Sequence, residues 1–217
     1  MTATWGLANR LGAGEVNVRL WSVSTSVHLL RRRCQQQYVT AKVIDNVGRG
    51  DCFFYALVNQ VLFTLGEPAM VALLARLSKR IVTKHNAHTV LRRIAANHID
   101  TYRAAAATRA MAAADLEIIQ SADKTANWAS IKALVGEDGA YTNIVFDQLL
   151  PDLASDVLQM PIMVLQPRTP PVLAGFRPEL RALRPGRPLV IYLDPRAEHY
   201  QSVVQQPMAA ELQALMH

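Results

Sequence analysis

The chain has 217 residues, about half of them apolar, which is enough for one domain with a substantial buried core and excludes a largely disordered protein. Its net charge of +6 is uneven, because basic residues crowd the middle of the chain while residues 136–167 contain no Lys or Arg. No window approaches the roughly eighteen apolar residues of a spanning helix, and the first twenty residues lack a signal-peptide apolar region, so we expect a cytoplasmic protein without a membrane partner.

The first predicted strand comes late in the chain. Residues 1–37 carry no clear period and end in RRRCQQQ, so we expect an N-terminal extension there. Residues 38–44 (YVTAKVI) alternate and are rich in β-branched side chains, which predicts a strand that runs into the loop DNVGRGD. Apolar residues then recur at helical spacing and predict a buried helix with Cys52 in its first turn: Phe54, Leu57, Val58, Val61, Leu62 and Leu65.

The remaining elements indicate an α+β protein with a small central sheet flanked by helices. Residues 68–135 favour three or four helices, and Thr142 is placed to cap a further helix that reaches Leu158. Short apolar runs predict strands at residues 162–165, 189–193 and 199–204, with a long connection over 167–188. We therefore expect one domain over residues 38–205, followed by a tail at 206–217 with a short helix.

The two cysteines, Cys34 and Cys52, are too few for a disulfide framework or a zinc site, so any cysteine chemistry belongs to a single thiol. Cys52 is the better placed, because the start of a helix favours the thiolate that acts as a nucleophile. Glycines at 48 and 50 allow the preceding backbone to turn and to direct its amides inward, as an oxyanion hole requires. Taken alone, this pattern also fits a buried structural cysteine.

A thiol nucleophile needs a base, and His199 is distinct among the six histidines because it opens a predicted strand. Side chains alternate along a strand, so His199 and Gln201 project to the same face, where the amide can orient the imidazole. A histidine at a strand end can equally be structural.

Two segments together are more specific. The string GRGDCFFYAL, followed much later by EHYQSV, resembles the two signature blocks of the ovarian tumour (OTU) family of cysteine peptidases. Between them, TNIVFDQLLPDLASDVLQMPIMVL resembles the helix and short strand that precede the histidine block in that family. The resemblance implies a papain-like OTU fold, Cys52 as nucleophile, His199 as base, and Gly50 with the amides of Asp51 and Cys52 as the oxyanion loop.

The chain departs from the family pattern at two positions. Arg49 stands where the family has an aspartate, with an acid shifted to Asp51, and Gln201 stands where the family has Asn or Asp after the histidine. An uncharged amide can fix the imidazole tautomer but stabilises an imidazolium less than a carboxylate does. We rank Gln201 first as the orienting residue, with three acids as alternatives: Asp45, Asp194 and Glu198.

The implied activity is hydrolysis of isopeptide bonds at the C-terminal glycine of ubiquitin, through a thioester and without a metal or organic cofactor. The expected partner is ubiquitin, polyubiquitin or a ubiquitin-like modifier, bound by a monomer. Because the ubiquitin tail is basic, we expect the acidic residues Glu137 and Asp138, together with Tyr200, to line its channel. Ordinary solvation of a loop explains the two acids equally well.

Three other functions remain open. The chain can be a papain-like hydrolase or acyltransferase on another substrate, or an inactive ubiquitin-binding relative, for which Arg49 and Gln201 are the arguments. A basic module that binds nucleic acid is supported by charge alone; its binding would fall steeply with added salt, and we expect no such partner. The alanine and arginine bias suggests a further hypothesis, a bacterial effector released into a host cell.

Overall fold

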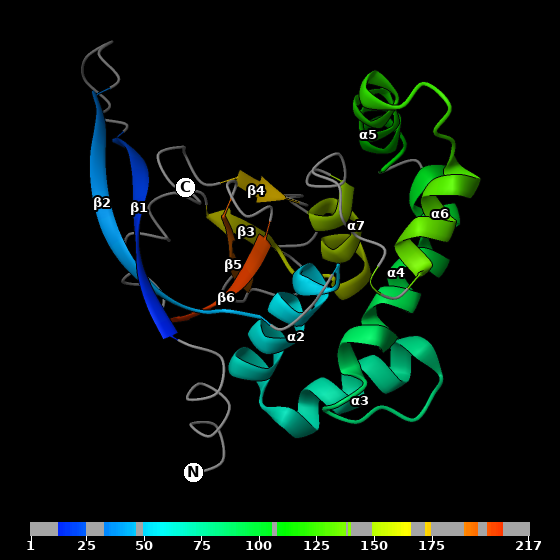
Figure 1. Cartoon of the computed structure of the whole chain (residues 1–217), viewed down its shortest axis with the longest axis horizontal. Coiled ribbons are helices and arrows are strands. Elements are labelled where there is room, and N and C mark those ends of the chain that lie inside the picture. Colours follow the sequence, from blue (N-terminus) through cyan, green and yellow to red (C-terminus); the bar gives the residue numbers. More distant parts are fainter. Residues whose placement is uncertain are drawn as a thin grey trace.

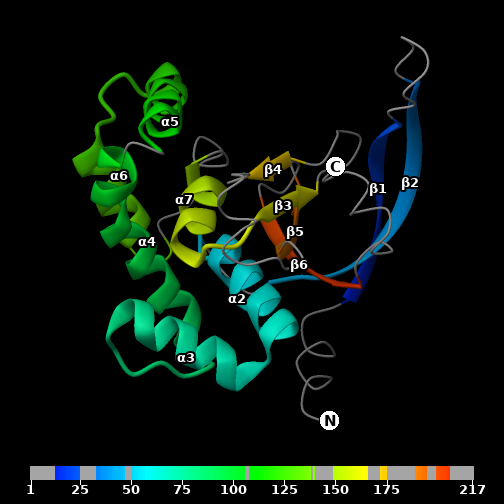
Figure 2. The same cartoon turned by 180° about the vertical axis from the view of Figure 1, so that it is seen from behind.

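The computed structural model describes residues 13–24, 33–46, 50–105, 108–137, 139, 149–165, 172–174, 189–194 and 199–205. They form a mixed α+β structure in which helices pack against a β-sheet (Figures 1 and 2). The strands are β1 (Ala13–Ser24), β2 (Arg33–Ile44), β3 (Ile162–Leu165), β4 (Val172–Ala174), β5 (Leu189–Asp194) and β6 (His199–Gln205). The helices are α2 (Cys52–Leu65), α3 (Glu67–Ser78), α4 (Ala87–Ala104), α5 (Arg109–Ala122), α6 (Trp128–Gly136) and α7 (Leu149–Leu158).

The sheet has the strand order β1-β2-β6-β5-β3-β4, in which only β3 and β5 are parallel among the described pairs. Its centre joins segments that are far apart in the sequence, because Ile44 at the end of β2 pairs with Ser202 in β6. The two strands are antiparallel, so the residues that follow β2 lie beside the residues that begin β6. This register brings the loop before α2 to His199.

Three strands near the C-terminus agree with the sequence predictions, whereas β4 lies in the segment that was expected to be a long connection, and the N-terminal part also differs. The strand runs expected at 162–165, 189–193 and 199–204 are present as β3, β5 and β6. However, β2 already begins at Arg33, and residues 13–24 of the expected extension form β1, which pairs with β2 along its whole length. The expected boundary at residue 37 therefore falls inside a strand. The Arg- and Gln-rich run lacks an apolar period, so the sequence does not predict a strand there, and the run forms one by pairing with β1.

The helical region also follows the prediction, with α3 to α6 spanning the segment in which three or four helices were expected. Helix α7 ends at Leu158 as predicted, but the expected cap at Thr142 and the short helix at 208–216 lie outside the described residues. No helix in the described part of the chain is long and apolar enough to cross a membrane.

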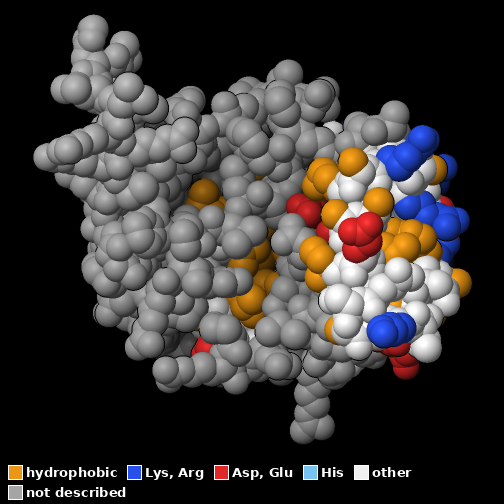
Figure 3. All heavy atoms as spheres, turned by 90° about the horizontal axis from the view of Figure 1, so that it is seen from above, with side chains coloured by type: hydrophobic (Ala, Val, Ile, Leu, Met, Phe, Trp, Pro, Cys, Tyr) orange, Lys and Arg blue, Asp and Glu red, His pale blue; other side chains and the backbone are white. Residues whose placement is uncertain are grey.

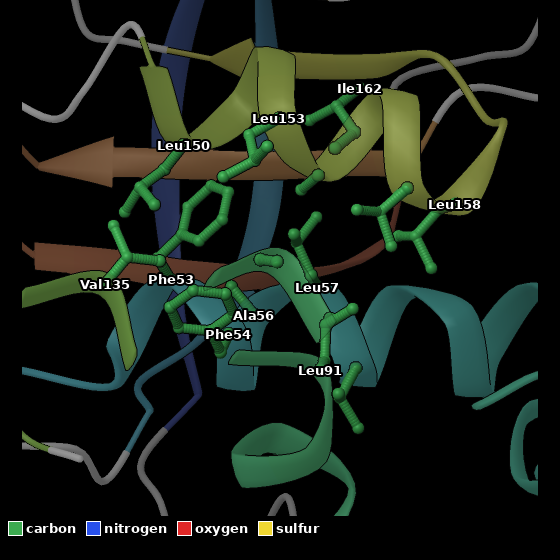
Figure 4. Packing of buried hydrophobic residues seen from close by; sticks show 14 of the residues in the cluster. Phe53, Phe54, Ala56, Leu57, Leu91, Val135, Leu150, Leu153, Leu158 and Ile162 are labelled. Carbon is green, nitrogen blue, oxygen red and sulfur yellow. The ribbon is translucent and has the colours of Figure 1, made fainter. Parts of the chain in front are cut away.

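The hydrophobic core is built around α2, which packs on β5 and β6 and also contacts α3 and α4. Phe53, Phe54, Ala56 and Leu57 are at most 1% exposed, and Figure 4 shows them among side chains from α4, α6, α7 and β3. Burying one large apolar side chain contributes about 1.5–3 kcal/mol. Because apolar partners surround the helix, its first turn is held firmly against β6.

Most basic residues of the helices lie on their outer side, whereas Arg92 is buried. Figure 3, a view from above, shows Lys and Arg side chains gathered at the outer edge of the helical part. Arg93, Arg103 and Arg109 are exposed, and Arg103 forms an ion pair with Asp100. The charge that suggested nucleic acid is thus spread over solvated faces of α4 and α5, and part of it is paired.

Candidate active site

Cys52 is the first residue of α2 and is 3% exposed. The chain enters the helix through Gly50, whose φ of +82° lies in the left-handed region that glycine adopts without strain. The backbone N–H of Tyr200, in β6, donates a hydrogen bond to Cys52 Sγ over 3.4 Å. A helix N-terminus and a donated N–H both favour a sulfur that carries negative charge.

His199 lies between the thiol and a carboxylate. Its neighbour in the chain, Tyr200, donates its backbone N–H to Cys52 Sγ, and the imidazole Nε2 lies 2.7 Å from Asp45 Oδ1. Since Nε2 is engaged by Asp45, Nδ1 is the ring nitrogen left to exchange a proton with the sulfur. Asp45 follows β2 directly, so the β2–β6 register is what brings this acid to the histidine.

The surroundings of His199 favour its charged form. The hydrogen bond to Cys52 is the strongest influence and, with the smaller contribution of Asp45, raises the pKa of His199 from 6.5 to about 9, although partial burial opposes the shift. At neutral pH the imidazole is therefore protonated beside the sulfur. An imidazolium beside the sulfur is the group that can pass a proton to a leaving amine in acyl transfer.

A buried polar network supports this arrangement from behind. Asn46 donates from Nδ2 to the Tyr200 carbonyl over 2.9 Å, and its Oδ1 accepts from Ser202 Oγ over 2.8 Å. Asn59, on α2, donates to both Ser202 Oγ and Asn46 Oδ1. The network ties the residue after Asp45 to both β6 and α2. It was not predicted, although polar residues inside the apolar runs of α2 and β6 were a signal.

Aromatic packing joins the two sequence blocks that carry the site. The Phe53 ring meets the Tyr200 ring edge to face, with centroids 5.0 Å apart. Both side chains are fully buried. The prediction that Tyr200 lines a substrate channel is therefore wrong for its side chain, because an aromatic residue beside an apolar helix gains more from burial in the core.

The structure brings the histidine to a different orienting group from the one ranked first. Asp45 bonds to His199, whereas no hydrogen bond between Gln201 and His199 occurs in the described residues. Gln201 instead pairs across the sheet with Tyr192. The prediction of Gln201 is therefore corrected in favour of Asp45. Asp194 lies opposite His199 in the β5–β6 register, and the third alternative, Glu198, is outside the described residues.

The expected oxyanion loop is described in its second half. Gly50 and Asp51 lead directly into Cys52, while Gly48 and Arg49 lie outside the described residues. Within this half, Asp51 precedes the first helical residue and its side chain does not cap the helix, so the first N–H groups of α2 have no intrahelical partners. Such amides are the donors that stabilise an oxyanion.

One of the two predicted acidic channel residues lies close to this loop. Glu137 is exposed. The Arg92 guanidinium donates hydrogen bonds to both the Glu137 carbonyl and the Gly50 carbonyl. The segment after α6 therefore borders the nucleophile loop, which is the part of the expected oxyanion loop, Gly50 and Asp51, that leads into Cys52. Asp138 lies outside the described residues.

A cleft of about 660 Å³ lies elsewhere, between α3, α4, α6 and α7. His98 and Asp156 form an ion pair in it at 2.8 Å, and Arg93 contributes to its lining. Neither Cys52 nor His199 lines this cleft. We assign the candidate active site to Cys52 and His199 because a thiol and a histidine–carboxylate pair come together there, whereas the cleft has a histidine–carboxylate pair but no cysteine among its lining residues.

No known family model matches this chain, and no curated protein matches it with significance. The site geometry and the two sequence blocks are therefore the observations that bear on function. A nucleophile, a protonated imidazole and an orienting carboxylate, next to free helical N–H groups, are suited to acyl transfer.

Proposed function

We propose that the protein is a cysteine peptidase of the OTU type that removes ubiquitin, with Cys52 as nucleophile, His199 as general base and acid, and Asp45 as the residue that orients the imidazole. The observation that carries the proposal is the nearness of Cys52 and His199 at the start of α2: the backbone N–H of Tyr200, the residue after His199, donates to Cys52 Sγ over 3.4 Å, although almost the whole domain separates the two in sequence. The papain-like arrangement of the fold belongs to the same proposal.

The proposed reaction is acyl transfer in two halves. The Cys52 thiolate attacks the carbonyl carbon of a terminal glycine, and the N–H groups of Asp51 and Cys52 stabilise the oxyanion. The His199 imidazolium gives its proton to the departing lysine amine, which leaves a thioester on Cys52. The neutral imidazole then takes a proton from water as the water attacks the thioester, and the acid product leaves while the thiolate and imidazolium are restored.

The substrate class rests on the resemblance to OTU peptidases and on the charge near the loop. The exposed carboxylate of Glu137 lies on the segment that borders the nucleophile loop, where a basic ubiquitin tail would pass. The location proposed with this function is the cytoplasm, either of the cell that makes the protein or of a host cell that receives it from a bacterium.

The direct test is incubation with ubiquitin that carries a thiol-reactive group at its C-terminus, followed by intact-protein mass measurement. We expect one covalent adduct that is lost in Cys52→Ala and retained in Cys34→Ala, the matched control at the second cysteine. His199→Ala should still bind ubiquitin but lose turnover by about 10²-fold or more, as expected for loss of the acid–base group.

Two results would refute the proposal. An adduct that persists in Cys52→Ala would assign the reactive thiol elsewhere. A wild-type protein that forms no adduct and cleaves no ubiquitin chain would remove ubiquitin as substrate, even if Cys52 reacts with other acyl donors.

A further inference from the structure

Arg92 is a fully buried cation whose contacts converge on the loop before the nucleophile. It lies in α4, its side chain is 0% exposed, and its guanidinium carbon sits 4.7 Å from the centroid of the Phe54 ring. Nη2 donates to the Gly50 carbonyl over 2.6 Å and lies 2.5 Å from Asp51 Oδ1. Nη1 donates to the carbonyls of Val135 and Glu137. Burying a charge at this depth requires many partners, and here the nucleophile loop and the end of α6 supply them.

The contact to Gly50 sets the direction of the next amide. The peptide between Gly50 and Asp51 is trans and planar, so its C=O and its N–H point in opposite directions. Since Arg92 holds the C=O, the N–H of Asp51 is directed away from Arg92. Without that bond, a glycine with a positive φ leaves this peptide free to rotate.

The contact to Asp51 has a second effect. An aspartate in front of a helix normally accepts hydrogen bonds from the first-turn N–H groups. Here Asp51 makes no side-chain cap to α2, and its carboxylate is instead paired with Arg92. The N-terminus of α2 is thus kept open, and a negative charge is held away from the place where an oxyanion would form.

From these contacts we propose that Arg92 is the positioning residue of the oxyanion hole: it orients the Gly50–Asp51 peptide and withdraws the Asp51 carboxylate, so that the N–H groups of Asp51 and Cys52 can bind the substrate oxygen. The inference rests on the proposed acyl transfer at Cys52. Arg92 also links the Glu137 segment to this hole, because one guanidinium binds both.

The test compares two reactions of the same thiol. Hydrolysis of a ubiquitin C-terminal fluorogenic amide passes through an oxyanion, whereas alkylation of Cys52 by iodoacetamide is a displacement at a saturated carbon and does not. Arg92→Lys keeps the charge but cannot bind four groups in one plane. The matched control is Arg93→Lys, at the neighbouring exposed position of the same helix.

We expect Arg92→Lys to lower kcat by about 10- to 100-fold, because losing an oxyanion donor costs about 10²–10³-fold and a misaligned donor costs less. The KM, the alkylation rate and its pH profile should change by less than about threefold, and Arg93→Lys should behave as wild type. Alkylation that falls in parallel with kcat would show that Arg92 merely maintains the fold, and an unchanged kcat would show that it does not position the hole. Either result overturns the inference.

If Arg92→Lys does not fold, Asp51→Asn carries the same test, since it weakens the pairing and leaves every backbone amide in place. We then expect kcat to fall about tenfold with an unchanged alkylation rate, and an unchanged kcat overturns the inference. Failure of the ubiquitin proposal can be distinguished from failure of the Arg92 inference. Ubiquitin is refuted as the substrate if the wild-type protein does not react with ubiquitin but is acylated at Cys52 by p-nitrophenyl acetate. The variants are then compared on hydrolysis of that ester. Wild type acylated by neither overturns both.

Discussion

Replacing Asp45 by Asn keeps the shape of the side chain that holds His199 but removes its charge. The bond that changes is the 2.7 Å contact between Asp45 Oδ1 and His199 Nε2. A hydrogen bond to a charged group is worth about 1.5–3 kcal/mol, and the lower end applies here because the Asp45 side chain is 56% exposed and screened by solvent. Since about 1.4 kcal/mol is a tenfold change in rate, we expect Asp45→Asn to lower kcat/KM by roughly 10- to 30-fold.

The pH dependence supplies a second readout of the same variant. Asp45 is one of the influences that raise the pKa of His199 to about 9, so the alkaline limb of the kcat/KM profile, where the imidazolium is lost, should lie near this value in wild type and at lower pH in Asp45→Asn. The assay is hydrolysis of a ubiquitin C-terminal fluorogenic amide over a pH series, with Gln201→Ala as control. Gln201→Ala should cost less than about threefold. The assignment of Asp45 is refuted if Gln201→Ala slows the reaction more than Asp45→Asn, or if the alkaline limb does not move.

Two further variants test the supports of the site and the helical core. Ser202→Ala removes one buried hydrogen-bond partner from each of Asn46 and Asn59. We therefore expect the free energy of unfolding to fall by about 1–3 kcal/mol and kcat to fall with an unchanged KM. A lower stability with full kcat would show that the network does not position the site. Burial is the main cause that raises the pKa of Asp115 to about 6, against the hydrogen bond from Tyr102. The folded form thus holds a proton that the unfolded form, with a pKa of about 4, releases, so stability falls as pH rises from about 4 through 6. In urea unfolding at pH 7, Asp115→Asn should therefore be more stable than wild type by about 1–2 kcal/mol. At pH 4 this gain in stability should be absent. An equal or lower stability of the variant at pH 7 contradicts this reasoning.

The local elements could be predicted from the residues because their signals are local. The apolar stripe from Phe54 onward places a buried helix after a glycine loop, and the structure begins that helix at Cys52. The apolar runs that became β3 and β5 are buried on both faces, and such runs need no knowledge of their neighbours to be recognised. The two chemical groups, Cys52 and His199, were therefore identified with their elements before any contact was known.

The orienting acid, the oxyanion support and the extent of the sheet were decided by tertiary pairing. Asp45 reaches His199 because Ile44 pairs with Ser202, and a shift of that register by one residue would turn the facing side chains to the opposite side of the sheet. In the sequence, Arg92 is not distinguished from the other arginines of a basic helix. Its side chain points inward because α4 packs against the loop that contains Gly50. Periodicity states which face of an element is buried, but the partner that each polar group finds there depends on the elements that arrive from elsewhere in the chain.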